Sequence, residues 1–125
     1  DCASKTIGGA IASSVLESAN LLDAKVIVAA TMSGLSARRI SNLRPKSPIL
    51  AACPSSDTAR GLMLNWGVYP VVTDVYSSTD EIVSDAKKKA SDFVSLSKGD
   101  IIVITGGFPN NTEIKSTNFM KIEQI

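Results

Sequence analysis

Two spacings of apolar residues alternate along the chain, one typical of helices and one typical of buried strands. Between residues 10 and 22 the apolar positions recur every three or four residues, which predicts an amphipathic helix. Its inward positions are Ile11, Val15, Ala19 and Leu22. The short β-branched run at 26–30 follows and predicts a strand that is buried on both faces.

The next helix and strand are predicted from capping residues and prolines. Ser33 or Ser36 can open a helix, which should end near Arg44 because Pro45 disfavours a helical conformation at the residue before it. The apolar run at 48–53 predicts a second buried strand.

A third helix is predicted after Ser56 or Asp57, either of which can cap its first turn. Gly67 is expected to end it in the left-handed conformation. The helical spacing predicts that Trp66 belongs to the core and does not form a platform for a ligand. The apolar positions with this spacing are Ala59, Leu62, Met63 and Trp66.

The second half of the chain continues the alternation of strands and helices. Residues 68–75 predict a strand, and Ser78 with Glu81 has the spacing of a capping box at the start of a long fourth helix. The lysines at 87–89 are interpreted as a solvated face of that helix. Its expected inner stripe is Ile82, Ala86, Ala90 and Phe93.

The last two strands are predicted without a helix between them. Residues 101–104 are the most apolar run, and the alternating segment 119–125 is typical of a half-exposed edge strand. The segment 106–118 is rich in Gly, Asn, Thr and Ser, and so long a loop suggests a functional role.

This order of elements predicts an α/β fold over residues 1–125 as a single domain. We expect three α/β/α layers in a doubly wound arrangement, with a mostly parallel five-stranded sheet and the last strand antiparallel at an edge. In such sheets ligands bind beyond the carboxyl ends of the strands, at the switch point of the strand order.

Composition removes several classes of function. The chain has 125 residues, no His, two Cys and a formal net charge of +1. The lack of His excludes Ser-His-Asp and Cys-His catalysis and, with so few Cys, the common structural zinc sites. The balanced charge does not indicate a nucleic-acid partner. No stretch is apolar enough for a membrane span and no signal segment leads the chain, so we expect a cytoplasmic protein.

One turn carries the strongest candidate chemistry. Residues 31–37 follow a predicted strand and open a predicted helix, and they combine three hydroxyls with Gly34. Free backbone N–H groups at a helix start suit a phosphate group, although Ser33 or Ser36 could equally serve only as a cap. Both interpretations stay open at this point.

Cys53 and Arg60 invite comparison with the cysteine phosphatase loop. The spacing here is one residue longer than in that loop, and no His is available to activate the thiol. Cys53 is therefore interpreted as a small apolar residue at a strand end.

Several motifs in one order give the chain a resemblance to the C-terminal domain of pyruvate kinase, above all in bacterial forms. They begin with Ala-Ile-Ala-Ser-Ser at 10–14 and the long segment IVAATMSGLSARRISNLRPKSPI at 27–49. Trp-Gly-Val-Tyr-Pro at 66–70, Gly-Asp-Ile-Ile-Val-Ile-Thr-Gly-Gly at 99–107 and Ser-Thr-Asn-Phe-Met-Lys at 116–121 follow. The resemblance covers nearly the whole chain.

The resemblance implies a domain that binds an effector and contributes to a homotetramer, with no catalytic residue and no metal site of its own. The parent enzyme would transfer phosphate from phosphoenolpyruvate to ADP with Mg²⁺ and K⁺, on a barrel that this chain lacks. The effector phosphate would lie in the Thr-x-Ser-Gly-x-Ser turn, formed here by Thr31, Ser33, Gly34 and Ser36. A loop before the last strand would close over it, formed here by Gly107, Pro109, Asn110, Asn111 and Thr112.

Departures from the family bear on which effector binds. Relatives that recognise fructose 1,6-bisphosphate carry basic residues where this chain has Met32 and Leu35, and a Trp and an Arg near the segment 76–83. A second phosphate would be poorly neutralised here. The expected effector is therefore a sugar monophosphate or a nucleotide monophosphate such as AMP.

Two alternatives remain from the sequence. The chain could be an assembly domain without effector binding, or a free-standing non-catalytic homologue. Because it starts at Asp1 and its first helix begins almost at once, we expect a fragment of a longer protein.

Overall fold

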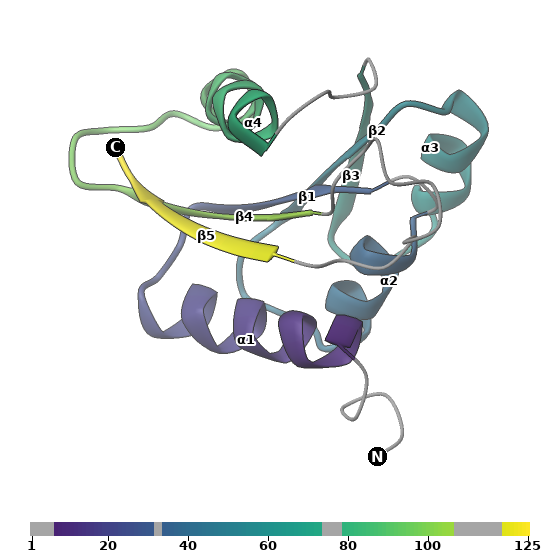
Figure 1. Cartoon of the computed structure of the whole chain (residues 1–125), viewed down its shortest axis with the longest axis horizontal. Helices are drawn as coiled ribbons and strands as arrows, with labels where there is room; N and C mark the ends of the chain where they lie inside the picture. Colours follow the sequence, from purple (N-terminus) through teal and green to yellow (C-terminus); the bar gives the residue numbers. More distant parts are fainter. Residues whose placement is uncertain (1–6, 32–33, 74–78, 107–118) are drawn as a thin grey trace.

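A computed structural model describes residues 7–31, 34–73, 79–106 and 119–125. Helices and strands alternate as predicted, up to the final pair of strands (Figure 1). The order is α1 (Ile7–Leu21), β1 (Val26–Ala30), α2 (Leu35–Asn42), β2 (Ile49–Cys53), α3 (Ser56–Leu62), β3 (Val68–Val72), α4 (Thr79–Phe93), β4 (Ile101–Gly106) and β5 (Phe119–Gln124).

The five strands form one sheet in the order β3-β2-β1-β4-β5. β1 pairs in parallel with β2 and β4, β2 pairs in parallel with β3, and β5 runs antiparallel to β4 at the edge. The chain builds outward from β1 to β3 and then returns to the other side of β1. The predicted doubly wound fold is confirmed, and its switch point lies between β1 and β4.

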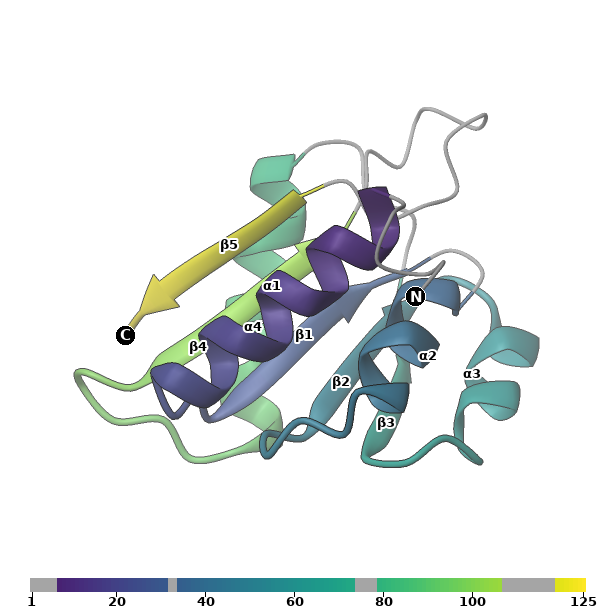
Figure 2. The same cartoon turned by 90° about the horizontal axis from the view of Figure 1, so that it is seen from below.

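The helices form a layer on each face of the sheet. Figures 1 and 2 show α1, α2 and α3 on one face and α4 on the other. Two clusters of buried side chains correspond to the two layers, one contributed by the three helices and one by α4. Ile27 faces the first cluster and Val28 the second, so β1 is covered on both sides. This explains why its sequence is a continuous apolar run.

The structure corrects the predicted boundaries of the third helix. α3 ends at Leu62, and its N-cap is Ser55, whose side chain accepts a hydrogen bond from the Thr58 N–H at 3.2 Å. Trp66 therefore lies beyond the helix and is 45% exposed, so its assignment to the core is wrong. Met63 is likewise 67% exposed.

Other boundaries and two inward positions also differ, and one of these positions, Leu22, lies beyond the end of α1 and is 41% exposed. α1 begins at Ile7, earlier than predicted, and β4 extends to Gly106. Phe93, predicted to face the core, is half exposed and packs beside Tyr69, with 5.1 Å between the two ring centroids. The remaining inner positions of α4 are buried as predicted, namely Ile82, Ala86 and Ala90.

Candidate functional site

The predicted phosphate turn lies at the switch point of the sheet. Thr31 directly follows β1, and its neighbour Ala30 pairs with Gly106, the last residue of β4. The Thr31 N–H donates to the carbonyl oxygen of Ala52 on β2 at 2.9 Å. Strand pairing therefore fixes the start of the turn between β2 and β4.

The turn is shaped by a hydrogen bond between Thr31 and Gly34. The Gly34 N–H donates to Thr31 Oγ1 at 2.9 Å in a buried position. Gly34 is the N-cap of α2 and has a left-handed backbone with φ 88°. Because a side chain is rarely tolerated at that φ, glycine permits the chain to enter α2 directly from β1.

The first turn of α2 presents backbone donors at this point. Its first intrahelical bond runs from the Arg38 N–H to the Gly34 carbonyl at 3.0 Å. The N–H groups of residues 35–37 precede it and have no carbonyl within the helix to bond. With the positive end of the helix dipole, such groups attract an anion.

The N-cap of α2 bears on whether the serines of the turn bind a phosphate group or only cap the helix. The N-cap of α2 is Gly34, which makes no side-chain cap bond, and Ser36 lies inside the helix and is 6% exposed. Ser36 is therefore not the N-cap. Ser33 lies outside the described residues, so its role stays a prediction.

The structure brings three of the four predicted phosphate-binding residues together, namely Thr31, Gly34 and Ser36. The predicted effector loop, with Gly107, Pro109, Asn110, Asn111 and Thr112, lies outside the described residues. Its flanking residues Gly106 and Phe119 pair with each other beside β1. The Thr105 hydroxyl donates to the Phe119 carbonyl at 2.9 Å, which fastens this pairing.

The turn is packed closely against α3. A Cβ on Gly34 would lie 3.2 Å from Leu62 Cδ2 and 3.3 Å from Thr58 Cγ2. These distances are shorter than ordinary van der Waals contacts. Glycine is therefore favoured at position 34 both because a Cβ would crowd α3 and because φ is positive.

The segment that contains the turn carries an excess of positive charge, which the net charge of the whole chain does not reveal. Of its five cations, only Arg38 and Arg39 lie on the helix that the turn opens, and the other three lie toward the amino ends of β1 and β2. Residues 24–56 contain no Asp or Glu, so this segment is more basic than the whole chain. In the described part of the chain, Arg39 Nη1 is the one buried side-chain polar atom without a hydrogen-bond partner. The cations of the segment are Lys25, Arg38, Arg39, Arg44 and Lys46.

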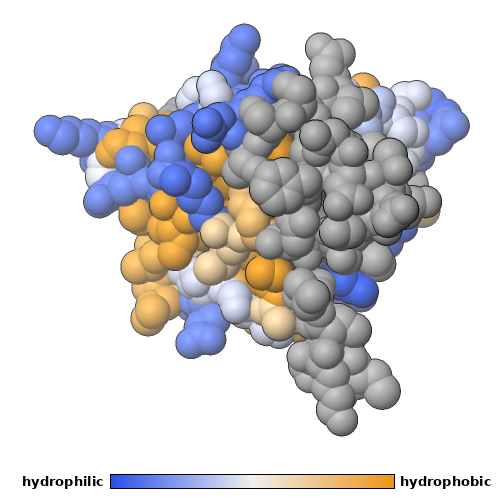
Figure 3. Space-filling view, viewed as in Figure 1, coloured by the Kyte–Doolittle hydropathy of each residue, from blue (hydrophilic) through white to orange (hydrophobic). Residues whose placement is uncertain are grey.

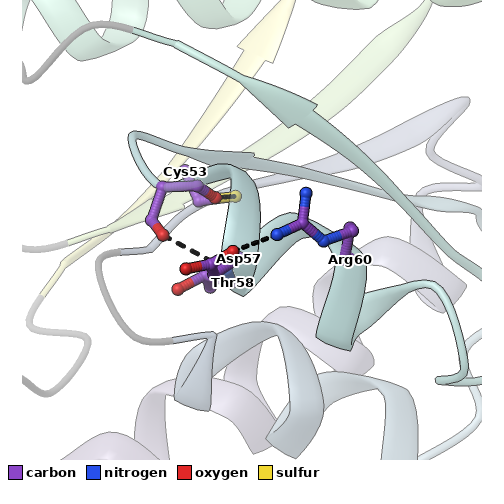
Figure 4. A network of polar contacts seen from close by, with 5 residues as sticks. Cys53, Asp57, Thr58 and Arg60 are labelled. Carbon is purple, nitrogen blue, oxygen red and sulfur yellow. Dashed lines mark hydrogen bonds and ion pairs between the residues drawn. The ribbon is translucent and has the colours of Figure 1, made fainter.

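Cys53 occupies the carboxyl end of β2 near the start of α3 (Figure 4). Its sulfur lies 3.8 Å from the carbonyl oxygens of both Ser55 and Val71, and burial raises the pKa of the thiol. Arg60 forms its ion pair with Asp57. A raised pKa disfavours the thiolate, which supports the interpretation of Cys53 as a structural residue.

The described residues also bear on metal binding and on membrane spanning. Across residues 7–31, 34–73, 79–106 and 119–125, no three His, Cys, Asp or Glu side chains gather in a way that could hold a metal ion. No helix in these ranges has the length and apolar character needed to cross a membrane.

Comparisons with known proteins agree with the fold and with the motifs. The family described as "Pyruvate kinase, alpha/beta domain" matches residues 9–123. A pyruvate kinase of Staphylococcus aureus is 46% identical over 116 residues, which are 93% of this chain and 20% of that protein. One of Clostridium acetobutylicum is 39% identical over 104 residues, which are 83% of this chain and 22% of that protein.

A solved structure extends the agreement to three dimensions. The crystal structure of a pyruvate kinase from Cryptosporidium parvum superimposes with a TM-score of 0.81 at 32% identity. The match covers 95% of this chain and 23% of that one. The chain thus spans about a fifth of the length of the curated relatives that it matches.

Proposed function

Because the chain belongs to the family of pyruvate kinase alpha/beta domains, we propose that it is the regulatory and tetramer-forming domain of a bacterial pyruvate kinase. The parent enzyme would transfer phosphate from phosphoenolpyruvate to ADP in the cytoplasm. The match to bacterial relatives over nearly the whole chain supports this assignment.

The turn formed by Thr31, Ser33, Gly34 and Ser36 is the proposed site for the phosphate group of an effector. The single observation that carries this proposal is the placement of the turn at the switch point, where α2 begins with a left-handed Gly34. Residues 107–112 would complete the site from the adjacent end of β4. Arg38 and Arg39, on the helix that the turn opens, favour an anion there.

The proposed effector is a sugar monophosphate or a nucleotide monophosphate. Met32 and Leu35 supply no charge for a second phosphate group. By resemblance to the family, the catalytic step, Mg²⁺ and K⁺ are assigned to the rest of the parent enzyme.

Calorimetry tests the effector role directly. Titration of the protein with glucose 6-phosphate, ribose 5-phosphate and AMP should give saturable heat for at least one of them. Ser33→Glu should weaken that binding by about tenfold or more, because a carboxylate beside the phosphate repels it. Ser91→Glu adds the same charge to α4, on the other face of the sheet, and should leave binding unchanged.

A lack of heat with every compound would contradict the effector role. So would equal binding by Ser33→Glu and Ser91→Glu, because the site would then lie elsewhere.

A second candidate function, assembly without effector binding, is favoured by an apolar surface along β5. Apolar side chains gather over β5 and the nearby end of α1 (Figure 3). Leu21 on α1 is 77% exposed and Ile122 on β5 is 41% exposed. β5 is also an edge strand without proline, whereas the opposite edge strand, β3, contains Pro70. As an edge strand, β5 has unpaired backbone groups along one side that can pair with another strand, although its charged Lys121 and Glu123 oppose such pairing.

Sedimentation velocity tests the assembly role. The wild-type protein should associate as its concentration rises, and Ile122→Lys should shift it toward the monomer. Leu64→Lys places the same charge at a residue that is 93% exposed near the other edge of the sheet, and it should leave association unchanged. A wild-type protein that stays monomeric at every concentration would contradict self-association through β5.

A further inference from the structure

Exposed large apolar side chains gather where β2 and β3 begin. Figure 2 shows the connection from α2 to β2 and the connection from α3 to β3 at the same end of the sheet. Leu64 is 93% exposed there, and Trp66, two positions later, is 45% exposed. Exposed apolar side chains that gather in one place mark sites of contact with other protein surfaces. We define the distal surface as Leu43, Arg44, Met63, Leu64 and Trp66.

Hydrogen bonds hold the backbone beneath the distal surface in place. The Ser41 hydroxyl, on α2, donates to the Trp66 carbonyl at 2.6 Å and joins the end of α2 to the segment before β3. The Asn65 N–H donates to the Leu62 carbonyl at 3.0 Å, and the Val68 N–H donates to the Asn65 carbonyl at 3.3 Å. A surface that is already ordered loses little conformational entropy when it binds a partner.

Arg44 adds a cation to this apolar surface. Its guanidinium carbon lies 5.3 Å from the centroid of the Trp66 ring, within reach of a cation–π interaction. Arg44 is exposed and forms no ion pair with another described residue. Its N–H groups match the planar geometry of a carboxylate, so the side chain is placed to receive one from outside the domain.

The sequence around the distal surface supplies no acidic partner for Arg44. Residues 24–56 contain no Asp or Glu, and the next acidic residue, Asp57, pairs with Arg60 on α3. A surface that complements this one would present apolar side chains toward Leu64 and Trp66 and a carboxylate toward Arg44.

The other exposed apolar side chains already have a neighbour or a proposed role. Tyr69 and Phe93 pack beside each other with 5.1 Å between their ring centroids. Leu21 and Ile122 belong to the surface proposed for self-association. The distal surface has neither, and the chain spans only 20% and 22% of two bacterial pyruvate kinases that it matches. In such relatives, most of the protein lies outside the matched part and has to meet this domain at some surface.

We propose that the distal surface docks against another domain of the parent enzyme, at a site with apolar side chains and a carboxylate that faces Arg44. The proposal rests on the function proposed above, in which the chain is one domain of a longer enzyme, and adds the face that meets the rest of it. Docking would bury Leu64 and Trp66 and give Arg44 an ion pair. Trp and Arg are the residues in which the binding energy of interfaces is most often concentrated.

Hydroxyl-radical footprinting tests the docking by comparing the 125-residue protein with the full-length parent enzyme. Mass spectrometry measures the rate at which each residue is oxidised. Trp66 should be oxidised about threefold or more slowly in the parent enzyme, because the core of an interface excludes water. Tyr69 is 48% exposed, close to the value for Trp66, and serves as the internal control. It should be oxidised at the same rate in both proteins.

A matched pair of charged substitutions tests the same contact in the parent enzyme. Leu64→Glu should raise the rate of proteolysis between the domains about tenfold or more, because it places a charge in the apolar contact. Val72→Glu adds the same charge at another exposed apolar residue, on β3, and should leave that rate unchanged. Neither variant should shift the unfolding midpoint of the 125-residue protein, in which both side chains face solvent.

A charge reversal tests the carboxylate of the partner. In the parent enzyme, Arg44→Glu should also raise proteolysis between the domains, because it repels the facing carboxylate, whereas Arg44→Lys should raise it less. Equal proteolysis in Arg44→Glu and the wild-type enzyme would contradict the proposed ion pair.

The outcomes distinguish this inference from the function on which it rests. Equal oxidation of Trp66 in the two proteins, or equal proteolysis of Leu64→Glu and Val72→Glu, overturns the docking and leaves the effector role standing. Protection of Trp66 that increases with the concentration of the 125-residue protein identifies a second copy as the occupant and also overturns it. A reading frame that encodes no further domain removes the parent enzyme and the docking together. The wild-type footprint alone is decisive should Leu64→Glu fail to fold.

Discussion

The two ends of the parallel strands carry opposite kinds of residue. At the carboxyl ends of β1 and β4, the residues are small or hydroxylic and buried, as in Thr31 and Gly106. At the amino ends of β2 and β3, large apolar side chains are exposed, as in Leu64 and Trp66. One end of the sheet is therefore built from small buried residues, and the other presents large exposed side chains.

Close packing explains why the carboxyl ends need small residues. A Cβ on Gly106 would lie 3.0 Å from Ala30 Cβ and 3.2 Å from Phe119 Cε1. Larger residues at these positions would force β1, β4 and β5 apart. The backbone of the turn is therefore held where a phosphate could approach it.

The largest expected effect separates two leucines that are two positions apart. Leu62 is fully buried beneath Gly34, whereas Leu64, shortly before β3, is 93% exposed. Leu62→Ala should lower the free energy of unfolding by about 2–5 kcal/mol because it leaves a cavity. Leu64→Ala should change it by less than about 0.5 kcal/mol. Urea denaturation followed by circular dichroism measures both, and equal losses would show that the two ends are not packed differently.

A smaller effect on the free energy of unfolding is expected from two glycines with positive φ, one at each end of the parallel strands. Gly34 has φ 88° and crowded surroundings, whereas Gly67 has φ 68° and no neighbouring atom within 4 Å of an added Cβ. Gly67→Ala should cost about 1–2 kcal/mol of unfolding free energy through backbone strain alone. Gly34→Ala should cost more, by about 1 kcal/mol or greater, because it adds crowding against Leu62. A cost no larger than that of Gly67→Ala would contradict the close packing of the turn.

Regular apolar patterns predicted the sheet and the switch point well. The continuous runs at β1 and β4 and the alternating edge strand β5 leave little choice of topology once crossovers are right-handed. The site position follows from that topology. The carboxyl end of β1 was therefore predictable, although Ser33 and residues 107–112 lie beyond what the structure describes.

The helical spacing of apolar residues led to a wrong prediction at the end of α3, because the spacing continues beyond the last residue of the helix. Met63 and Trp66 continue the spacing of α3, but the helix ends at Leu62 and both residues face solvent. Trp66 is instead held by Ser41 and Arg44, partners more than twenty positions away in the sequence. Spacing within one segment carries no information on such contacts. The excess of cations over acidic residues at 24–56, by contrast, was visible in the sequence, and two of these cations, Arg38 and Arg39, lie on the helix that the turn opens.

The smallest expected effect concerns Cys53, which is fully buried at the carboxyl end of β2. Burial raises the pKa of its thiol, so the folded protein holds this proton more tightly than the unfolded chain does. Its contribution to stability is complete at pH values well below about 8.5, the pKa of an unfolded cysteine, and is lost as the pH rises through the folded pKa. Wild-type protein should therefore lose slightly more stability above that pH than Cys53→Ala does.

Alkylation provides a second measurement on the same residue. In a Cys2→Ser background at pH 8, iodoacetamide should modify native Cys53 about tenfold or more slowly than in urea, since the thiol is both buried and protonated. Rapid modification of the native protein would indicate an accessible thiolate and reopen a reactive role for Cys53.

The central claim, that the carboxyl end of β1 binds the phosphate group of an effector, is tested most directly by mapping backbone amides. Two-dimensional ¹H–¹⁵N spectra are recorded while glucose 6-phosphate or AMP is added. We predict saturable shifts that are largest at Thr31, Gly34 and Ser36. Shifts confined to residues far from the turn, or none with any phosphorylated compound, would contradict the claim.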